Sequence, residues 1–236
     1  MTTTLIIGGS SGIGLATARL LLARGDEVHI AGRSVERLDA ARSALGDVPA
    51  HVLDALDTEA VGALAAKLAP VDRLVLTLSG NEGAGRLAEL DIAALRRAFD
   101  AKFWGHVTAL RATLPHLGEN ASITLLGAIT ARAGMPGTAG IAAVNAAVEA
   151  LVAPLAAELA PVRVNAVSPG YVDTPWWDML PEPDRRAFFD GVASGLPTRR
   201  IATADDVAEV VTLAATNPNL TGTVIEADGG ARLVAA

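Results

Sequence analysis

The chain has 236 residues, of which 51% are hydrophobic, and a formal net charge of -7 at pH 7. This size and composition predict one domain with a large core, and the acidic balance without a basic cluster argues against nucleic acid as a partner. Because the sequence has no cysteine, disulfides and thiolate metal sites are excluded; we expect no bound metal and a cytoplasmic location.

The hydrophobicity is not concentrated in a targeting or membrane segment. The N-terminal stretch MTTTLIIGGSSG has neither a basic region nor a long apolar run, so no signal peptide is expected. No segment reaches about 18 uninterrupted apolar residues, so no membrane span is expected. A sheet buried on both faces accounts for the composition better.

Short β-rich runs alternate with Ala- and Leu-rich helical runs along the whole chain. In chain order we expect a strand at 4–9, a helix at 13–25, a strand at 27–33, a helix at 35–46, a strand at 49–55, a helix at 58–68, a strand at 72–80, a helix at 91–117, a strand at 121–128, a helix at 140–151, a strand at 162–170, a helix at 203–215 and a strand at 222–230. Pro154 predicts a kink near Ala150. Strands that are apolar on both faces and separated by helices predict an α/β fold: one Rossmann-type doubly wound parallel sheet, flanked by helices on both faces, in a single domain over residues 1–236.

One stretch, 171–196, interrupts this rhythm. It carries three prolines and five of the chain's eight aromatic residues, including Tyr171. This composition is typical of a flexible lid over a pocket at the carboxyl ends of the strands. The alternative is a pair of surface helices that packs on a neighbouring subunit.

A glycine-rich loop follows the first strand and opens the first helix. Glycines in IIGGSSGIG let the backbone turn tightly and approach a pyrophosphate, which the helix N-terminus stabilises through free N–H groups and its dipole. The strand–turn–helix context favours a dinucleotide site over an empty tight turn. The binding residues expected from this loop are Gly8, Ser10, Ser11, Gly12, Ile13 and Gly14.

The end of the second strand bears on the choice between NAD and NADP. A carboxylate for a ribose 2′-hydroxyl is expected about 20 residues after the glycines, but Gly32 stands there and Arg33 follows. A guanidinium suits a 2′-phosphate, so NADP is favoured over NAD; the alternative is a solvated arginine that caps the next helix. Asp54, after the third strand, is either an acceptor for the adenine amino group or a solvated turn residue.

With these features the chain resembles the short-chain dehydrogenase/reductase family. The resemblance is carried by GGSSGIG, by RVNAVSPGYVDTP and by TGTVIEADGG, and it spans essentially the whole chain. It implies an oxidoreductase that assembles as a homo-oligomer, a dimer or tetramer built on the long helices. It also implies that the cofactor is bordered by further residues: Ser79, Gly80, Pro169, Gly170, Val172 and Thr174.

The same resemblance implies four catalytic side chains, Asn, Ser, Tyr and Lys, of which Tyr exchanges the proton and Lys lowers its pKa. Alignment places these positions at Lys102, Ala128, Ile141 and Asn145. The usual phenol–ammonium pair therefore cannot be assembled, because isoleucine does not titrate and an amide carries no charge.

Lys102 is the candidate for the missing acid–base group. A lysine that points into the pocket is desolvated, which lowers its pKa towards neutrality and suits it to proton transfer. The alternative is that Lys102 points outward or pairs with Asp100 or Glu149. His106, one turn on, is expected to be a packing residue. Positioning groups near the pocket are expected at Ser79, Asn81, Thr130 and Tyr171.

Three functions remain open. The first is an NADP-dependent oxidoreductase with an atypical active site, acting on a small carbonyl or alcohol substrate. The second is an NADP-binding protein without redox turnover, such as a sensor or an inactive subunit. The third is a non-redox enzyme, a dehydratase, cyclase or isomerase, on the same fold. The intact cofactor loops favour the first.

Overall fold

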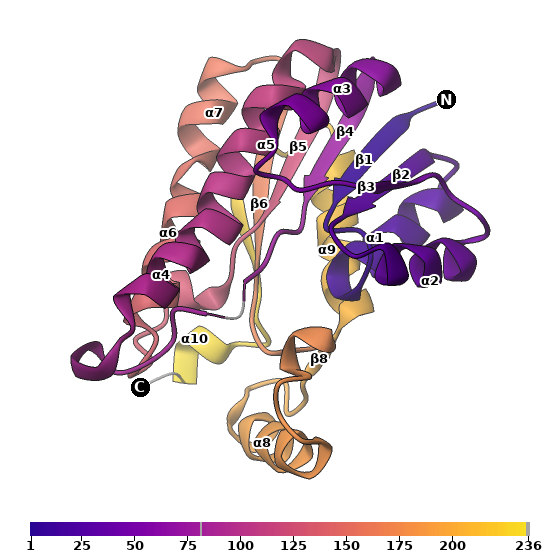
Figure 1. The fold of residues 1–236 in the computed structure, drawn as a ribbon. Coiled ribbons are helices and arrows are strands. Elements are labelled where there is room, and N and C mark those ends of the chain that lie inside the picture. The colour runs from indigo at the N-terminus through magenta and orange to yellow at the C-terminus, as the bar shows by residue number, and fades with distance from the viewer. Residues whose placement is uncertain (81, 235–236) are drawn as a thin grey trace.

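The computed structural model describes residues 1–80 and 82–234. Over these residues the chain forms a seven-stranded sheet in the order β3-β2-β1-β4-β5-β6-β9, and every neighbouring pair is parallel (Figure 1). This confirms the predicted doubly wound α/β fold. The strands are β1 (Thr3–Ile7), β2 (Glu27–Gly32), β3 (Ala50–Val52), β4 (Val71–Leu76), β5 (Leu117–Leu126), β6 (Arg163–Pro169) and β9 (Val224–Ala227).

Helices cover both faces of the sheet. Figure 1 shows α3, α5, α6 and α7 on one side and α1, α2 and α9 on the other. Alternate residues of each strand point to opposite faces, so Leu5 and Ile7 join the core under the first group while Ile6 joins the core under the second. The helices are α1 (Gly12–Ala23), α2 (Val35–Leu45), α3 (Thr58–Leu68), α4 (Ile92–Ala98), α5 (Gly105–Thr113), α6 (Ala139–Ala150), α7 (Val152–Glu158), α8 (Glu182–Gly195), α9 (Ala204–Thr216) and α10 (Ala231–Val234).

The stretch Ala139–Glu158 is apolar and long enough, by length and composition, to cross a membrane. Its apolar side chains are used in the core, because Val148, Val152 and Leu155 pack on the sheet. The helix is interrupted before Pro154, at Leu151 between α6 and α7, although the Leu151 backbone stays in the right-handed helical region; the kink near Ala150 stays a prediction. Packing on the sheet therefore accounts for part of this apolar composition, since 33% of the apolar window is buried.

The helix expected at 91–117 is not continuous. α4 ends at Ala98, a π-helical segment η2 (Phe99–Trp104) follows, and α5 then runs to Thr113. A π turn is wider than an α turn, so it changes the direction in which the side chains of that turn point. The prediction of one regular helix was wrong at this point, which is also where Lys102 lies.

The order of the strands reverses between β1 and β4. β1 has β2 on one side and β4 on the other, with Leu5 in register with His29 and Leu74. In open parallel sheets, ligands bind beyond the carboxyl ends of the strands at such a point. We therefore expect the ligand-binding site at the loops that follow β1 and β4.

Candidate active site

The loop after β1 is shaped by glycines that no other residue could replace without strain. Gly8 has a φ of +97°, in the left-handed region. A Cβ on Gly14 would lie 2.3 Å from the carbonyl oxygen of Gly8 and 2.5 Å from Thr77 Oγ1. The close packing of α1 on this loop, and of the loop on the end of β4, requires both glycines.

The N-terminus of α1 has no side-chain cap. The Ser11 hydroxyl makes no capping hydrogen bond, and the first turn contains no acidic residue. The first N–H groups of a helix have no partner within the helix, so this end presents donors and a positive dipole. Thr174 lies beside it, since a Cβ on Gly12 would be 3.3 Å from the Thr174 side chain. The glycine-rich loop after β1 and the segment that follows β6 thus meet at the start of α1.

The end of β2 lies next to the same loop. A Cβ on Gly32 would be 3.2 Å from Ser10 Oγ, and Arg33 follows with an exposed side chain. Ser34, not Arg33, caps α2, because its side chain accepts from the Arg37 N–H. The capping role considered for Arg33 is therefore taken by its neighbour.

Asp54 follows β3 and is exposed. Its Oδ1 accepts a hydrogen bond from the Leu56 N–H at 3.0 Å. This hydrogen bond is that of an Asx turn. The adenine contact expected for Asp54 stays a prediction.

The loop after β6 continues into the 171–196 segment. Pro169 is buried, and a Cβ on Gly170 would lie 2.6 Å from the carbonyl oxygen of Asp228. Val172 pairs with Ala202 in a short two-stranded sheet of β7 (Val172–Asp173) and β8 (Ala202–Thr203). These contacts fix the exit of β6 before the aromatic residues begin.

The 171–196 segment is helical rather than irregular. It contains the short helix η5 (Pro175–Trp177) and α8, which lies beyond the carboxyl ends of the strands in Figure 1. Trp176 Nε1 donates to the carbonyl of Gly80 at 2.9 Å, so the segment contacts the loop after β4. It therefore reaches from the end of β6 across to the switch point.

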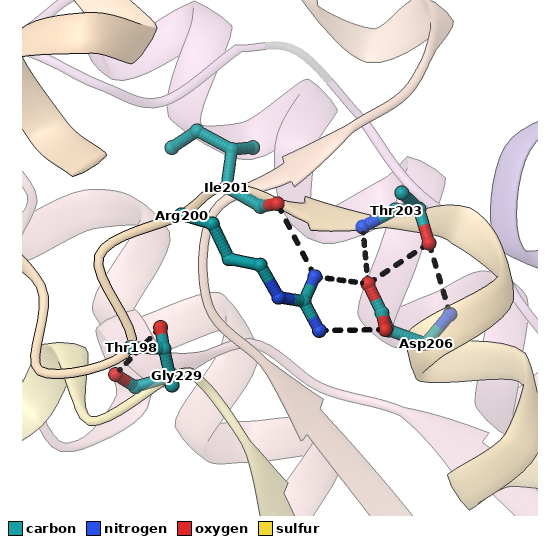
Figure 2. A network of polar contacts seen from close by, with 6 residues as sticks. All are labelled: Thr198, Arg200, Ile201, Thr203, Asp206 and Gly229. Carbon is teal, nitrogen blue, oxygen red and sulfur yellow. Dashed lines mark hydrogen bonds and ion pairs between the residues drawn. The ribbon is translucent and has the colours of Figure 1, made fainter.

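An ionic network secures the chain where it leaves this segment (Figure 2). Arg200 donates through both terminal nitrogens to the carboxylate of Asp206, which also accepts from the backbone N–H and the hydroxyl of Thr203. Thr203 and Asp206 form a capping box at the start of α9. Thr198 Oγ1 donates to the carbonyl of Gly229 at 3.2 Å. The end of the segment is thus attached to both α9 and the loop after β9.

The aromatic residues of the segment pack on one another. Trp177 contacts Trp176, Tyr171 and Phe188, with ring centroids 4.6 to 6.3 Å apart. The Tyr171 hydroxyl donates to Met135 Sδ at 3.3 Å, and burial raises its pKa. Tyr171 therefore belongs to the packing of this segment and is poorly suited to exchange protons at neutral pH.

The positions aligned with the family's Tyr and Lys lie side by side on α6. Ile141 packs against the loop after β4, because a Cβ on Gly83 would be 3.6 Å from its Cγ2. Asn145 Nδ2 donates to Thr130 Oγ1 and to the Ile141 carbonyl, both at 2.9 Å. Asn145 Oδ1 is buried and has no hydrogen-bond partner among the described residues. A buried amide oxygen of this kind is an acceptor that lacks its donor.

Lys102 points inward. Its residue is 8% exposed, and Nζ donates to the carbonyl of Gly127 at 3.1 Å. Ala128, at the position aligned with the family's Ser, is the next residue in the chain. Desolvation lowers the pKa of Lys102 to about 8, although the negative charge of Glu149 opposes the shift. The outward orientation considered for Lys102 is therefore wrong.

His106 is a packing residue, as expected. It is fully buried, with Nδ1 2.7 Å from the carbonyl oxygen of Lys102 and Nε2 3.3 Å from that of Leu76. Burial lowers its pKa to about 4. A neutral imidazole has one N–H, which donates to one of these two carbonyls, so His106 packs at the end of η2 rather than exchanging protons with a substrate.

Two charged residues were not predicted as part of the site: Glu149, which was expected only as a possible pairing partner for Lys102, and Arg132. Arg132 Nη2 lies 2.8 Å from Glu149 Oε2, and Glu149 is 7% exposed. Of the other expected groups, Ser79 is exposed beside Gly80, and Asn81 lies outside the described residues. Among the described residues, no group of three or more His, Asp or Glu is arranged to hold a metal.

Comparison with known proteins finds reductases and dehydrogenases that are similar over nearly the whole chain. A family model described as enoyl-(acyl carrier protein) reductase matches residues 8–232. The cis-4-hydroxycyclohexanecarboxylate dehydrogenase of Sinomonas cyclohexanicum is 34% identical over 95% of this chain and 94% of its own length.

Two solved structures are also similar over nearly the whole chain. A small-chain dehydrogenase in complex with NADPH is 35% identical, covers 98% of this chain and 99% of its own, and superposes with a TM-score of 0.87. The NADPH-bound short-chain oxidoreductase of Pseudomonas aeruginosa PAO1, described as containing an atypical catalytic centre, is 32% identical, with coverage of 97% and 96% and a TM-score of 0.89.

Proposed function

The chain belongs to the short-chain dehydrogenase/reductase family of oxidoreductases, and from this premise we propose that it is an NADP-dependent oxidoreductase with an atypical active site, in which Lys102 exchanges the proton. The observation that carries the proposal is the position of Lys102. Its ammonium is buried on the Gly127 carbonyl, directly before the residue aligned with the family's Ser.

The residues at the site fit a dinucleotide. The uncapped start of α1 and the close-packed glycines offer N–H donors to a pyrophosphate. The buried Asn145 Oδ1, which lacks a donor among the described residues, suits a ribose hydroxyl. Arg33 lies exposed beside the loop and suits a 2′-phosphate, which supports NADP over NAD. When bound, the cofactor supplies or accepts the hydride.

Lys102 performs the remaining task. An ammonium has three N–H donors and the Gly127 carbonyl takes one of them, so two remain for a substrate oxygen. With a pKa of about 8, both the ammonium and the free amine are populated near neutral pH. In reduction, Lys102 Nζ donates a proton to the carbonyl oxygen; in oxidation, the neutral amine accepts the proton of the alcohol.

The substrate in this proposal is a small carbonyl or alcohol compound. The aromatic residues of 171–196 would act as a lid that excludes water from the pocket, within a single domain spanning the chain. The name of the 34% identical relative indicates an alicyclic hydroxy acid as one compound class to test. Assembly as a dimer or tetramer and a cytoplasmic location are also part of the proposal.

The cofactor component is tested by titrating NADPH and NADH into the protein and following nicotinamide fluorescence. We expect NADPH to bind more tightly than NADH. If neither binds more tightly than about 1 mM, both cofactor-dependent readings fail. If NADPH binds but a panel of cyclic and linear ketones and alcohols gives no absorbance change, the reading as a binding protein without turnover replaces this one.

A further inference from the structure

A buried carboxylate, that of Glu149, lies beside Gly127, the residue just after β5 whose carbonyl binds Lys102 Nζ. Glu149 is 7% exposed although it is charged, and the other residues of α6 are uncharged. Its Oε2 pairs with Arg132, whereas its Oε1 is buried without a hydrogen-bond partner among the described residues. Burial raises the pKa of this carboxyl, while the Ser168 hydroxyl, Arg132, Lys102 and the Ala128 N–H act to lower it. A buried carboxylate is costly unless neighbouring groups of this kind compensate for its desolvation.

Gly127 stands between Glu149 and Lys102. Its carbonyl accepts the hydrogen bond from Lys102 Nζ at 3.1 Å. On its other side, a Cβ would lie 2.4 Å from Glu149 Oε1 and 2.8 Å from Glu149 Cγ. The absence of a side chain at this position is what lets the carboxylate approach the end of β5. The two charges thus face each other across one glycine, without a direct ion pair between them.

We propose that Glu149 is a positioning residue for Lys102: its carboxylate, held by Arg132 behind Gly127, stabilises the ammonium and keeps Nζ on the Gly127 carbonyl. This inference rests on the proposed catalytic role of Lys102. Glu149 does not touch the substrate. It acts by supplying the negative charge that opposes the desolvation of a buried lysine.

The charged groups around the pair agree with this assignment. Glu149 and Lys102 raise and lower each other's pKa as opposite charges do, whereas burial acts against both. Arg132 faces Glu149 from the turn after β5 and also lies near Glu226 on β9. His106 faces Lys102 from α5 through the Lys102 carbonyl. Among the described residues Glu149 is the carboxylate whose charge acts on the pKa of Lys102, so a neutral residue at 149 would remove that charge.

The test uses the fact that the chain has only two lysines, Lys67 and Lys102. Lysine labelled with ¹³C at Cε gives two resonances, and Lys67→Met assigns them. We expect the pKa of Lys102 to fall by about one pH unit in Glu149→Gln, because an opposite charge at short range is removed. Glu158→Gln, an exposed carboxylate on the same pair of helices, is the control and should leave it unchanged. An unchanged Lys102 pKa in a folded Glu149→Gln protein overturns the proposal.

A second measurement does not depend on that variant folding. In the unmodified protein, Lys102 Cε should show a small additional step at acid pH as Glu149 titrates. Arg132→Gln removes the ion-pair partner of Glu149 and should move this step to higher pH, whereas a step due to His106 would stay in place. No step, or a step that Arg132→Gln does not move, contradicts the inference. Because the readout is independent of turnover, it separates failure of this inference from failure of the proposed reaction.

Discussion

The buried ammonium of Lys102 should cost the protein stability, and its removal should therefore stabilise the fold while abolishing activity. The perturbation is Lys102→Met, which keeps an unbranched side chain of similar reach but removes the charge. A lysine whose pKa is lower in the folded protein than in the unfolded chain destabilises the fold while it is protonated.

The magnitude follows from the pKa. A fall from the ordinary value of 10.5 to about 8, at about 1.4 kcal/mol per pH unit, corresponds to about 3 kcal/mol. Methionine leaves the Gly127 carbonyl without its donor, which offsets about 1 kcal/mol. We therefore expect Lys102→Met to raise the free energy of unfolding by about 2 kcal/mol at pH 7.

The pH dependence of this stability difference tests the reasoning more specifically than its size at pH 7 does. The penalty is fully present below pH 8 and disappears as the pH rises from about 8 towards 10.5, because the folded protein releases the proton first. Urea unfolding at pH 7 and pH 10, at one fixed protein concentration, measures it, with Lys67→Met on the exposed face of α3 as the control. A Lys102→Met protein that is less stable at pH 7, or whose advantage is the same at both pH values, would refute the reasoning.

Four further predictions follow from the site. Arg33→Ser should weaken NADPH binding by about 10-fold or more and leave NADH binding nearly unchanged, because a charge-assisted hydrogen bond is lost; an unchanged ratio of the two dissociation constants would remove Arg33 from the site. Gly14→Ala places a Cβ 2.3 Å from the Gly8 carbonyl oxygen and should cost about 1–3 kcal/mol in urea unfolding, whereas Gly62→Ala within α3, whose Cβ would only contact the Ala112 carbonyl oxygen at 3.8 Å, should stabilise by up to about 1 kcal/mol; equal effects would mean that the loop is not close-packed. Trp176→Ala removes the hydrogen bond to Gly80 and should increase proteolysis within 171–196 and raise KM, whereas Trp104→Ala should change neither. Thr203→Ala removes the α9 cap and should cost about 1 kcal/mol, and a loss below a few tenths of that value would show the box of Figure 2 to be dispensable.

The sheet was predictable because its physics is local. Apolar residues on both faces of short strands, separated by helical runs, identify a parallel sheet without knowledge of any contact. Even the break before Pro154 follows from the chemistry of one residue, since proline cannot donate in the helix.

The site was only partly predictable, because its decisive contacts join residues far apart in the chain. The sequence left open whether Lys102 points into the pocket or outward, and the structure buries it within the π-helical segment η2, which the sequence analysis did not predict. Glu149 is the one charged residue of α6, and only its approach to Gly127, 22 positions earlier, makes it part of the site. For 171–196 the composition left a flexible lid and a pair of surface helices open, and the structure forms η5 and α8 there, with Pro183 in the first turn of α8, where proline is well tolerated.

The central claim is that Lys102 exchanges the proton in an NADP-dependent reaction. The most direct measurement follows nicotinamide absorbance while NADPH is mixed with a panel of small ketones, 4-oxocyclohexanecarboxylate among them, for three proteins: the unmodified chain, Lys67→Met and Lys102→Met. We predict oxidation of NADPH by the first two with at least one ketone and its loss in Lys102→Met, with NADPH binding retained. Equal rates in all three proteins would contradict the account.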